Sequence, residues 1–543
     1  MSRASLVVLA AVVAMTGCAT SPTRQDLRSL VPELVGTVTE TVHRQDDDLL
    51  SAGLGLAGLR QLPAPASAVP DPAALRRRAI HASWRGIADL RPQSMPEALP
   101  VVPGREFQAQ LQLAGDRHAH RVVLQLPDDF DSARPCLVVA PASGSRGVYG
   151  AIAVAGPVAL PRGCAVVYTD KGAGSNFQAL DDGGVRVPHA HSQDNPEARW
   201  GEHVLVAARF GLALLGEAGL RRAPFTAADT RVVAVGISNG GGAVLRATEL
   251  DGDGLLAAAV AAAPNIDVDW PGSRPIYDYV TEAAIYQPCL LAGEAWRDAP
   301  FVTDALREQG RIRCRLLAAA GLLDARTGTG QAREAHERLR AAGWEPGALR
   351  LAGQNIAFDL WRAVAVTYAS AYGRYGTGEH PCGYGFATLD AGGGRRIASE
   401  AERAAWSSDG SGIPPTAGVA LVDPAAGGED AALPGLMCLR RLWLEEGPDS
   451  ERVRAGIASV RASGRPLTAN ITVLHGADDA LVPPAFSSRP WVAAARARGA
   501  RIASEELPAV QHFDAFLLLP AMAGYQPLLP ATWQALERTL RRD

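Results

Sequence analysis

A serine lies in a glycine-framed motif that could make it a nucleophile. Residues 236–240 have the sequence G-I-S-N-G, with Ser238 at the centre. The run before them, R-V-V-A-V, is typical of a buried strand, and residues 243–247 have a helix-like composition. A G-x-S-x-G motif between a strand and a helix exposes the serine hydroxyl on a sharp turn, and the helix N-terminus favours negative charge there. We therefore predict a nucleophilic Ser238, against the alternative of a glycine-rich turn that happens to contain serine.

The acid of a catalytic triad is predicted in a second turn that also follows a strand. Residues 471–474 are strand-like and lead into H-G-A-D-D-A-L-V-P at residues 475–483. This matches the H-G-x-x-D-x-x-V-P turn found after a late strand of many α/β-hydrolases. In that register the acid is Asp479, and its neighbour Asp478 is a turn residue.

A serine hydroxyl also needs a base, which the acid orients. His512 is the one histidine after Asp479 and follows it by 33 positions (512 − 479). The order Ser, Asp, His is the chain order of the α/β-hydrolase triad. We predict that His512 takes the proton of Ser238 and that Asp479 holds the imidazole. His475, in the turn itself, is the alternative base.

The oxyanion hole should combine the backbone N–H of Asn239 with one from the loop after an early strand. That loop has the sequence V-V-A-P-A-S-G-S at residues 138–145. It departs from the H-G-G-G pattern of lipases, so Ser143 and Gly144 are both candidates and the sequence does not choose between them.

Short apolar runs alternate with helical segments through the region that contains these motifs. Continuous apolar runs of this length are typical of parallel strands covered on both faces, and their alternation with helices predicts an α/β fold with a mostly parallel, doubly wound sheet. With the serine motif, this indicates the α/β-hydrolase fold. The predicted strands are residues 118–126, 136–140, 164–169, 231–236, 255–262 and 471–474, with a helix over residues 202–215.

The spacing of the triad predicts a large insertion. Ser238 and Asp479 are 241 positions apart (479 − 238), whereas two strand-helix units need only about 60 to 80 residues. We therefore expect the hydrolase core at residues 104–269 and 466–543 and a cap at residues 270–465, with helices over residues 331–342 and 360–371. A cap over the nucleophile would exclude water and shape the acyl pocket. Residues 19–103 have no clear strand rhythm and are predicted as an N-terminal wrapping segment with short helices.

The first residues have the pattern of an export signal. Arg3 precedes a ten-residue apolar run, residues 6–15, which is too short to span a bilayer. Residues 15–18, M-T-G-C, also resemble the lipobox of bacterial lipoproteins, in which the cysteine carries the lipid. We expect residues 1–18 to be a signal peptide and the protein to be exported, either secreted or anchored to a membrane through a lipidated Cys18.

Six cysteines remain once Cys18 is set aside. An even number in an exported chain permits disulfides, but fifteen connectivities are possible, and free buried thiols at Cys136 and Cys164 are equally compatible with their strand-like surroundings. No C-x-x-C pair is present, so neither zinc nor a thiol nucleophile is expected.

Composition and charge exclude other classes of function. The net charge of −4, from 53 basic and 57 acidic residues, leaves no excess of positive charge for nucleic acid. No cofactor is expected, and a small-molecule ester is the predicted partner.

Five polar residues could be drawn as a metal site but lack a ligand pattern, so we interpret them as a polar loop: His189, His191, Asp194, Glu197 and His203. Asp170 and Lys171 are interpreted as solvated or pocket-rim charges.

Longer stretches of the chain resemble one known family, the bacterial D-(−)-3-hydroxybutyrate oligomer hydrolases. The likeness covers most of the chain after about residue 30. It includes V-Y-G-A-I-A (148–153), Y-T-D-K-G (168–172), the serine motif extended to residue 246, R-P-I-Y-D-Y (274–279), F-S-S-R-P (486–490) and Q-H-F-D-A-F (511–516). The resemblance implies hydrolysis of short 3-hydroxybutyrate oligomers, such as the dimer and trimer, to the monomer during polyhydroxybutyrate breakdown. It supports Ser238 by motif, whereas Asp479 and His512 depend on position. The lipobox-like Cys18 is a departure.

Two other functions share these sequence features. A tannase-like or feruloyl-type esterase would have the same triad and a large cap but a different acyl group. A non-catalytic surface protein on a hydrolase scaffold would have no need of Ser238 and His512.

Overall fold

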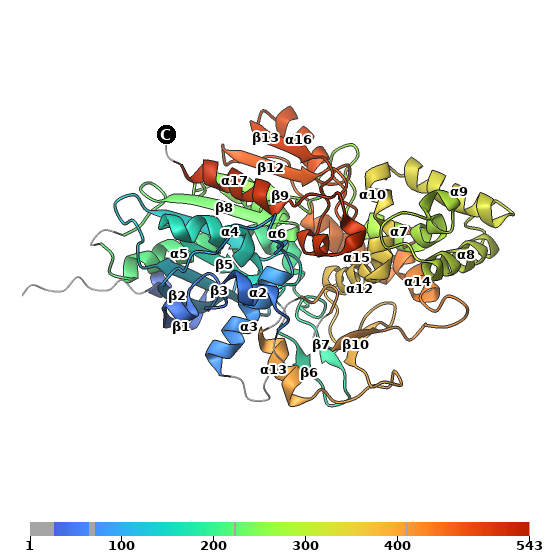
Figure 1. Ribbon diagram of the computed structural model, residues 1–543, viewed down its shortest axis with the longest axis horizontal. Helices are drawn as coiled ribbons and strands as arrows, with labels where there is room; N and C mark the ends of the chain where they lie inside the picture. The colour runs from blue at the N-terminus through green and yellow to red at the C-terminus, as the bar shows by residue number, and fades with distance from the viewer. Residues whose placement is uncertain are drawn as a thin grey trace, which may run out of the picture.

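The computed structural model describes residues 27–63, 71–174, 176–221, 224–408, 411–415 and 418–541. Within them a nine-stranded sheet runs through the molecule in the order β1-β2-β3-β5-β4-β8-β9-β12-β13 (Figure 1). Its strands are β1 (Leu34–His43), β2 (Gly104–Leu111), β3 (His120–Pro127), β4 (Cys136–Pro141), β5 (Ala165–Thr169), β8 (Arg231–Ile237), β9 (Ala258–Ala262), β12 (Ile471–Gly476) and β13 (Ile502–Leu507).

The sheet is antiparallel at one end and parallel at the other. β1, β2, β3 and β5 pair in antiparallel fashion, and every pair from β5 to β13 is parallel. Parallel neighbours need crossover connections, which helices supply here. The mostly parallel, doubly wound sheet predicted from the sequence is therefore present.

Helices cover both faces of the sheet because successive strand residues are apolar. Leu137 and Val139 point into a core with α5 (Trp200–Glu217), α6 (Asn239–Leu250) and α16 (Ser488–Ala497). Val138 and Ala140 point to the opposite face, into a core with α3 (Pro72–Arg85), α4 (Ile152–Ala159) and α17 (Leu529–Leu540). The two-residue period of a strand thus divides one apolar run between two cores.

The N-terminal segment contributes a strand that the sequence analysis did not predict. β1 extends the sheet beyond β2, and α2 (Gly55–Arg60) and α3 follow it along the chain (Figure 1). Most residues of β1 are exposed or half-buried. A strand at the edge of a sheet needs little apolar patterning, which explains why no strand rhythm marks it in the sequence.

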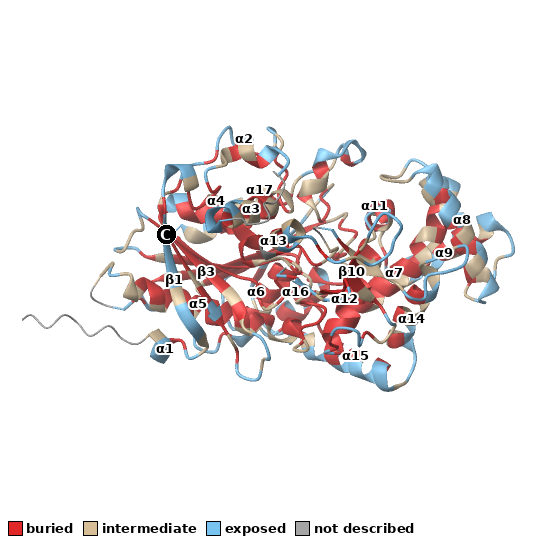
Figure 2. Ribbon diagram, turned by 90° about the horizontal axis from the view of Figure 1, so that it is seen from below, coloured by how far each residue is buried: buried red, intermediate tan, exposed pale blue. Residues whose placement is uncertain are grey.

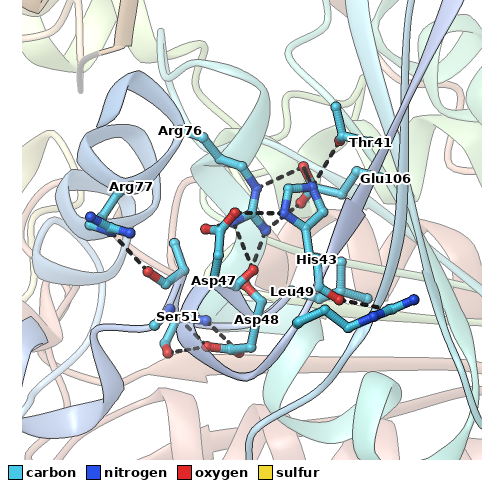
Figure 3. Close-up of polar contacts among 12 residues, drawn as sticks. Thr41, His43, Asp47, Asp48, Leu49, Ser51, Arg76, Arg77 and Glu106 are labelled. Carbon is cyan, nitrogen blue, oxygen red and sulfur yellow. Dashed lines mark hydrogen bonds and ion pairs between the residues drawn. The ribbon is translucent and has the colours of Figure 1, made fainter. Parts of the chain in front are cut away.

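A buried ionic cluster joins this segment to the sheet (Figure 3). Arg76 of α3 donates two hydrogen bonds to Glu106 of β2, each 2.8 Å long, and a third to Asp47. Glu106 also accepts from Gln125 and from the hydroxyl of Tyr149, both at 2.7 Å. We call the group the Glu106 cluster; its members are His43, Asp47, Arg76, Glu106, Gln125 and Tyr149.

The chain between β9 and β12 forms a largely helical insertion with its own apolar core. In Figure 1 most of its helices lie beyond the end of the sheet, and Figure 2 shows that the outer helices α8 and α9 expose much of their surface. The helices are α7 (Ile276–Leu291), α8 (Asp304–Ala319), α9 (Gly328–Ala341), α10 (Pro346–Arg350), α11 (Ala352–Ala357), α12 (Leu360–Tyr372), α13 (Glu400–Ser408), α14 (Leu433–Leu444) and α15 (Pro448–Val460), with the short strands β10 (Gly385–Thr388) and β11 (Val419–Val422).

The six cysteines form three disulfides, Cys136–Cys164, Cys289–Cys314 and Cys382–Cys438. One of them lies in the sheet and the other two in the insertion. The predicted signal peptide and Cys18 lie outside the described residues. Of the helices in the described ranges, none has the length and apolar character that a bilayer span requires.

Candidate active site

Ser238 lies on the predicted turn between β8 and α6. Its backbone has φ 58° and ψ −126°, a conformation that non-glycine residues seldom adopt. A Cβ atom on Gly236 would lie 2.4 Å from the carbonyl of Gly240, and one on Gly240 would lie 2.6 Å from the carbonyl of Pro141. The glycines therefore permit the close approach of backbone segments that this strained turn requires.

The three predicted triad residues form one hydrogen-bonded chain. His512 Nε2 lies 2.8 Å from Ser238 Oγ, and His512 Nδ1 lies 2.6 Å from Asp479 Oδ2. All three side chains are buried. The structure thus brings together residues that are far apart in sequence, in the geometry needed for a base to activate a serine.

Asp479 is held as a carboxylate. Although burial by itself raises its pKa, His512 and His475 hold the pKa of Asp479 well below its usual range. Its Oδ1 also accepts the backbone N–H groups of Leu481 and Val482, at 2.9 and 2.8 Å. An ionised Asp479 can orient the imidazole of His512 and stabilise the imidazolium.

His475, the alternative base, occupies a supporting position. Its Nδ1 lies 2.6 Å from Ser488 Oγ, and its Nε2 contacts both Asp479 Oδ2 (3.2 Å) and the carbonyl of Val482 (2.8 Å). Both ring nitrogens of His475 therefore already have hydrogen-bond partners. Asp478 is half-buried, and burial raises its pKa.

The candidate oxyanion residues line the same pocket as Ser238. Asn239 is the first residue of α6, so its backbone N–H has no partner within the helix. Ser143 and Gly144 both face this pocket, and Gly144 lies close to the Asn239 side chain. Both loop candidates remain compatible with the geometry.

A buried polar group behind Asn239 was not predicted. The Asn239 side chain donates to the Tyr368 hydroxyl (2.9 Å) and accepts from Asn265 (2.7 Å). Tyr372, one turn further along α12, donates to Glu197 Oε2 at 2.7 Å. We call this group the Glu197 cluster; its members are Lys171, Glu197, Asn239, Tyr368 and Tyr372.

Among the described residues, no cation makes a hydrogen bond to Glu197. Burial raises its pKa to about 7, although Tyr368, Tyr372 and the nearby Lys171 act to lower it. Its Oε1 has no hydrogen-bond partner within the described part of the chain. The predicted polar loop is present at His189, His191 and Asp194, which lie between β7 (Val185–Arg186) and the 3₁₀ helix η4 (Pro196–Arg199). It is wrong for Glu197, which belongs to η4, and for His203, which belongs to α5.

Lys171 is also buried, which corrects its interpretation as a solvated or rim charge. Its Nζ donates to the carbonyl of Ala142, next to Ser143, and lies 4.3 Å from the ring centre of Trp200. Burial lowers the pKa of Lys171 to about 7. Asp170 is buried as well. In the described ranges, no group of three or more His, Cys, Asp or Glu side chains is placed to hold a metal ion.

The mostly parallel sheet and the strained serine turn at its edge define the α/β-hydrolase class. Comparison with known sequences then gives the family. The model of the 3HB-oligomer hydrolase family matches residues 13–188 and 184–538, and the chain belongs to this family.

Curated relatives agree with this assignment. The D-(−)-3-hydroxybutyrate oligomer hydrolase of Paracidovorax citrulli is 34% identical, over 88% of this chain and 82% of the relative. The protein of the same name from Burkholderia thailandensis is 33% identical, over 95% of this chain and 87% of the relative. Among solved structures, an esterase from Aspergillus oryzae is similar at 12% identity, over 90% of this chain and 83% of that one, with a TM-score of 0.38. The fold assignment depends on the strand order and register described above.

Proposed function

We propose that the protein is a serine esterase that hydrolyses short 3-hydroxybutyrate oligomers, such as the dimer and trimer, to 3-hydroxybutyrate in polyhydroxybutyrate degradation. One observation carries the proposal: the hydrogen-bonded chain from Asp479 through His512 to Ser238, on a strained turn beside a pocket. The names of the relatives supply the substrate class.

In the first half of the reaction, Ser238 Oγ attacks the ester carbonyl while His512 Nε2 takes the hydroxyl proton. The carbonyl oxygen becomes an oxyanion, which the backbone N–H of Asn239 and one from Ser143 or Gly144 would bind. The intermediate then collapses, the bond to the leaving alkoxide breaks, and His512 returns the proton to that oxygen.

In the second half, water attacks the acyl-enzyme. His512 takes a proton from the water, and the acyl group leaves as a free acid while Ser238 regains its proton. Asp479 stays ionised throughout, in agreement with its lowered pKa. The reaction consumes one ester and one water and releases an acid and an alcohol.

Product analysis on purified 3-hydroxybutyrate dimer and trimer tests the proposal. We expect monomer as the product, and loss of several orders of magnitude in kcat for Ser238→Ala, with labelling of the wild type but not the variant by a fluorophosphonate probe. A wild type that is neither labelled nor active would indicate a non-catalytic protein. Cleavage of galloyl or feruloyl esters alone would indicate the alternative esterase.

The neighbouring aspartates provide a matched pair for the acid. Asp479→Asn should lower kcat by about 10⁴, because the wrong imidazole tautomer is then favoured. Asp478→Asn removes the same charge one position away and should change kcat by less than about tenfold. Equal losses would contradict the assignment of Asp479.

We also propose that the protein is exported and that Cys18 is lipidated. Three disulfides support export, because such bonds persist in oxidising compartments. Two or three acyl chains on Cys18 would hold the enzyme at a membrane. Intact mass of the mature protein and cell fractionation of Cys18→Ser test this; a mature protein without lipid that begins elsewhere would contradict lipidation but leave export standing.

A further inference from the structure

A row of phenylalanine rings leads from the catalytic histidine to the protein surface. The Phe513 ring lies 4.8 Å from that of His512, Phe516 lies 5.1 Å from Phe513, and Phe358 lies 4.7 Å from Phe516. Phe301 completes the group, 5.6 Å from Phe358 and 6.4 Å from Phe516. We call these four residues the aromatic ridge.

The ridge joins the two parts of the molecule that surround the pocket. Phe513 and Phe516 follow His512 in the hydrolase core, and Phe516 belongs to the 3₁₀ helix η6 (Asp514–Leu518). Phe358 lies in the turn between α11 and α12, and Phe301 precedes α8, both in the insertion. The ridge is therefore built from segments distant in sequence that the fold brings together.

Exposure rises outward along the ridge. Phe513 lines the pocket of Ser238 and is half-buried, whereas Phe358 is 38% exposed and Leu518 and Leu519, at the end of η6, are 47% and 37% exposed. Phe358 is the one aromatic residue among the exposed large apolar side chains of the described ranges. The exposed part of Phe358 adjoins the half-buried rings of Phe516 and Phe301, and adjoining apolar surface marks a binding site more often than isolated exposed residues do.

The charged side chains next to the ridge already have partners. Asp359 accepts from Arg362 at 2.9 Å, and Asp514 accepts the backbone N–H groups of Leu528 and Leu529 at 2.8 Å. A ligand on the ridge would therefore contact rings and aliphatic groups, which favours a neutral chain with methyl groups over a charged one.

We propose that the aromatic ridge binds the ester units of an oligomer that lie beyond the scissile bond. This inference rests on the proposed function and adds a subsite to it. The ridge is continuous with the pocket through Phe513, so a substrate held at Ser238 and longer than that pocket would extend along the rings. Each additional neutral, methyl-bearing unit would bury apolar surface against Phe516 and Phe358. The enzyme would then prefer longer soluble oligomers to the dimer.

Phe358→Ala, assayed on the 3-hydroxybutyrate dimer through hexamer, tests the subsite. Because Phe358 is exposed, its truncation should cost little stability, which Tm checks. We expect the ratio of kcat/KM for hexamer to that for dimer to fall about tenfold, equivalent to about 1.4 kcal/mol. Phe358→Leu, which keeps an apolar side chain, should recover part of that ratio.

Val42→Ala is the control, since Val42 is 56% exposed on β1, toward the opposite end of the molecule from α11 (Figure 2). Val42→Ala should leave the ratio of kcat/KM for hexamer to that for dimer unchanged.

Equal losses on dimer and hexamer in Phe358→Ala, or no loss on either, would overturn the proposal. A ratio that is unchanged while binding to phospholipid vesicles falls would identify the ridge as a membrane contact instead. A wild type that cleaves the dimer without any dependence on length contradicts the ridge alone; one that cleaves no member of the series contradicts the proposed function, and the ridge with it.

Discussion

Two buried carboxylates, Glu106 and Glu197, show opposite ways of placing an acid inside a protein. Glu106 is paired with Arg76, which holds the pKa of Glu106 below its usual range although burial alone would raise it. Glu197 has a tyrosine donor at 2.7 Å and, in the described part of the chain, no cation in hydrogen-bond contact, and burial raises its pKa to about 7. Both clusters border the loop that carries Ser143 and Gly144: Tyr149 lies just after this loop and Lys171 bonds to Ala142 within it.

The difference indicates different roles. A charge that is fully paired stabilises the packing of the N-terminal segment on the sheet and should be insensitive to pH near neutrality. A carboxylate that titrates near pH 7, and whose neighbour Tyr368 accepts a hydrogen bond from Asn239, connects protonation to the residue beside Ser238. Changes in the Glu106 cluster should therefore alter stability, and changes in the Glu197 cluster should alter kcat and its dependence on pH.

The largest expected effect is on stability, from Arg76→Met. The variant leaves Glu106 buried without its cation, which costs about 3–5 kcal/mol for a buried pair. Thermal unfolding measures the loss, and kcat per folded molecule should stay within about twofold of the wild type.

The double variant Arg76→Met/Glu106→Gln is the control for charge. It removes the unpaired carboxylate and should recover a large part of the lost stability. If Arg76→Met kept a normal Tm but lost most of its kcat, the Glu106 cluster would affect activity and not stability, which would contradict the roles given to the two clusters.

The second prediction concerns pH and Glu197. A raised pKa means that Glu197 binds its proton more tightly in the folded protein than in the unfolded chain. The contribution of Glu197 to stability is therefore complete below about pH 4.5 and is lost as the pH rises through about 7. The pKa of Glu197 rises from 4.5 to about 7 on folding. At about 1.4 kcal/mol per pKa unit, this shift corresponds to about 3 kcal/mol of folding free energy. In the folded protein the pKa of Lys171 is lowered to about 7, so the contribution of Lys171 to stability changes with pH only above about pH 7.

Glu197→Gln keeps the shape and the acceptor but cannot ionise. Its Tm relative to the wild type should therefore increase steadily from pH 5 to pH 8. Parallel Tm curves for the two proteins over this range would show that Glu197 does not titrate there.

The sequence predicted most of the sheet and the proximity of Ser238, Asp479 and His512, because local patterns mark them. Apolar runs predicted strands that the structure places at β4 and β8 with nearly the same bounds. Ser238 and Asp479 follow strands whose carboxyl ends meet at one edge of the sheet, so their proximity was predictable from chain order.

The Glu197 cluster was not predicted because its contacts join residues with no local relation. Glu197 and Tyr372 are 175 positions apart, and Asn239 and Tyr368 are 129 apart. Charged residues are seldom fully buried, so the sequence favours a solvated or pocket-rim Lys171 rather than a buried one. One signal was present: Tyr368 lies in the helix predicted over residues 360–371 and Tyr372 directly follows it, so a helix one residue longer places both on one face.

The third prediction separates Asn239 from the rest of its cluster. Tyr368→Phe removes the hydroxyl that accepts from the Asn239 side chain. The loss of one hydrogen bond of this kind, about 1 kcal/mol, should lower kcat about fivefold by loosening Asn239, whose backbone N–H is proposed for the oxyanion hole. Steady-state kinetics should show a smaller change in KM. An unchanged kcat would mean that Asn239 is held by Asn265 and the turn alone.

The smallest expected effect is a difference in pH dependence between two matched tyrosine variants. Each tyrosine donates to a buried carboxylate at 2.7 Å: Tyr149 to Glu106 and Tyr372 to Glu197. In Tyr149→Phe, Arg76 and Gln125 still hold Glu106 ionised, so stability should fall by about 1–2 kcal/mol equally at pH 6 and pH 8. In Tyr372→Phe, Glu197 loses a donor to its charged form, so its pKa should rise further and the loss should be larger at pH 8 than at pH 6, where the carboxyl is already protonated in the folded protein. Tm of both variants at the two pH values is the measurement. If the Tm losses of the two variants changed equally between pH 6 and pH 8, the pairing of Glu106 with Arg76 would not make the two carboxylates differ in their response to pH.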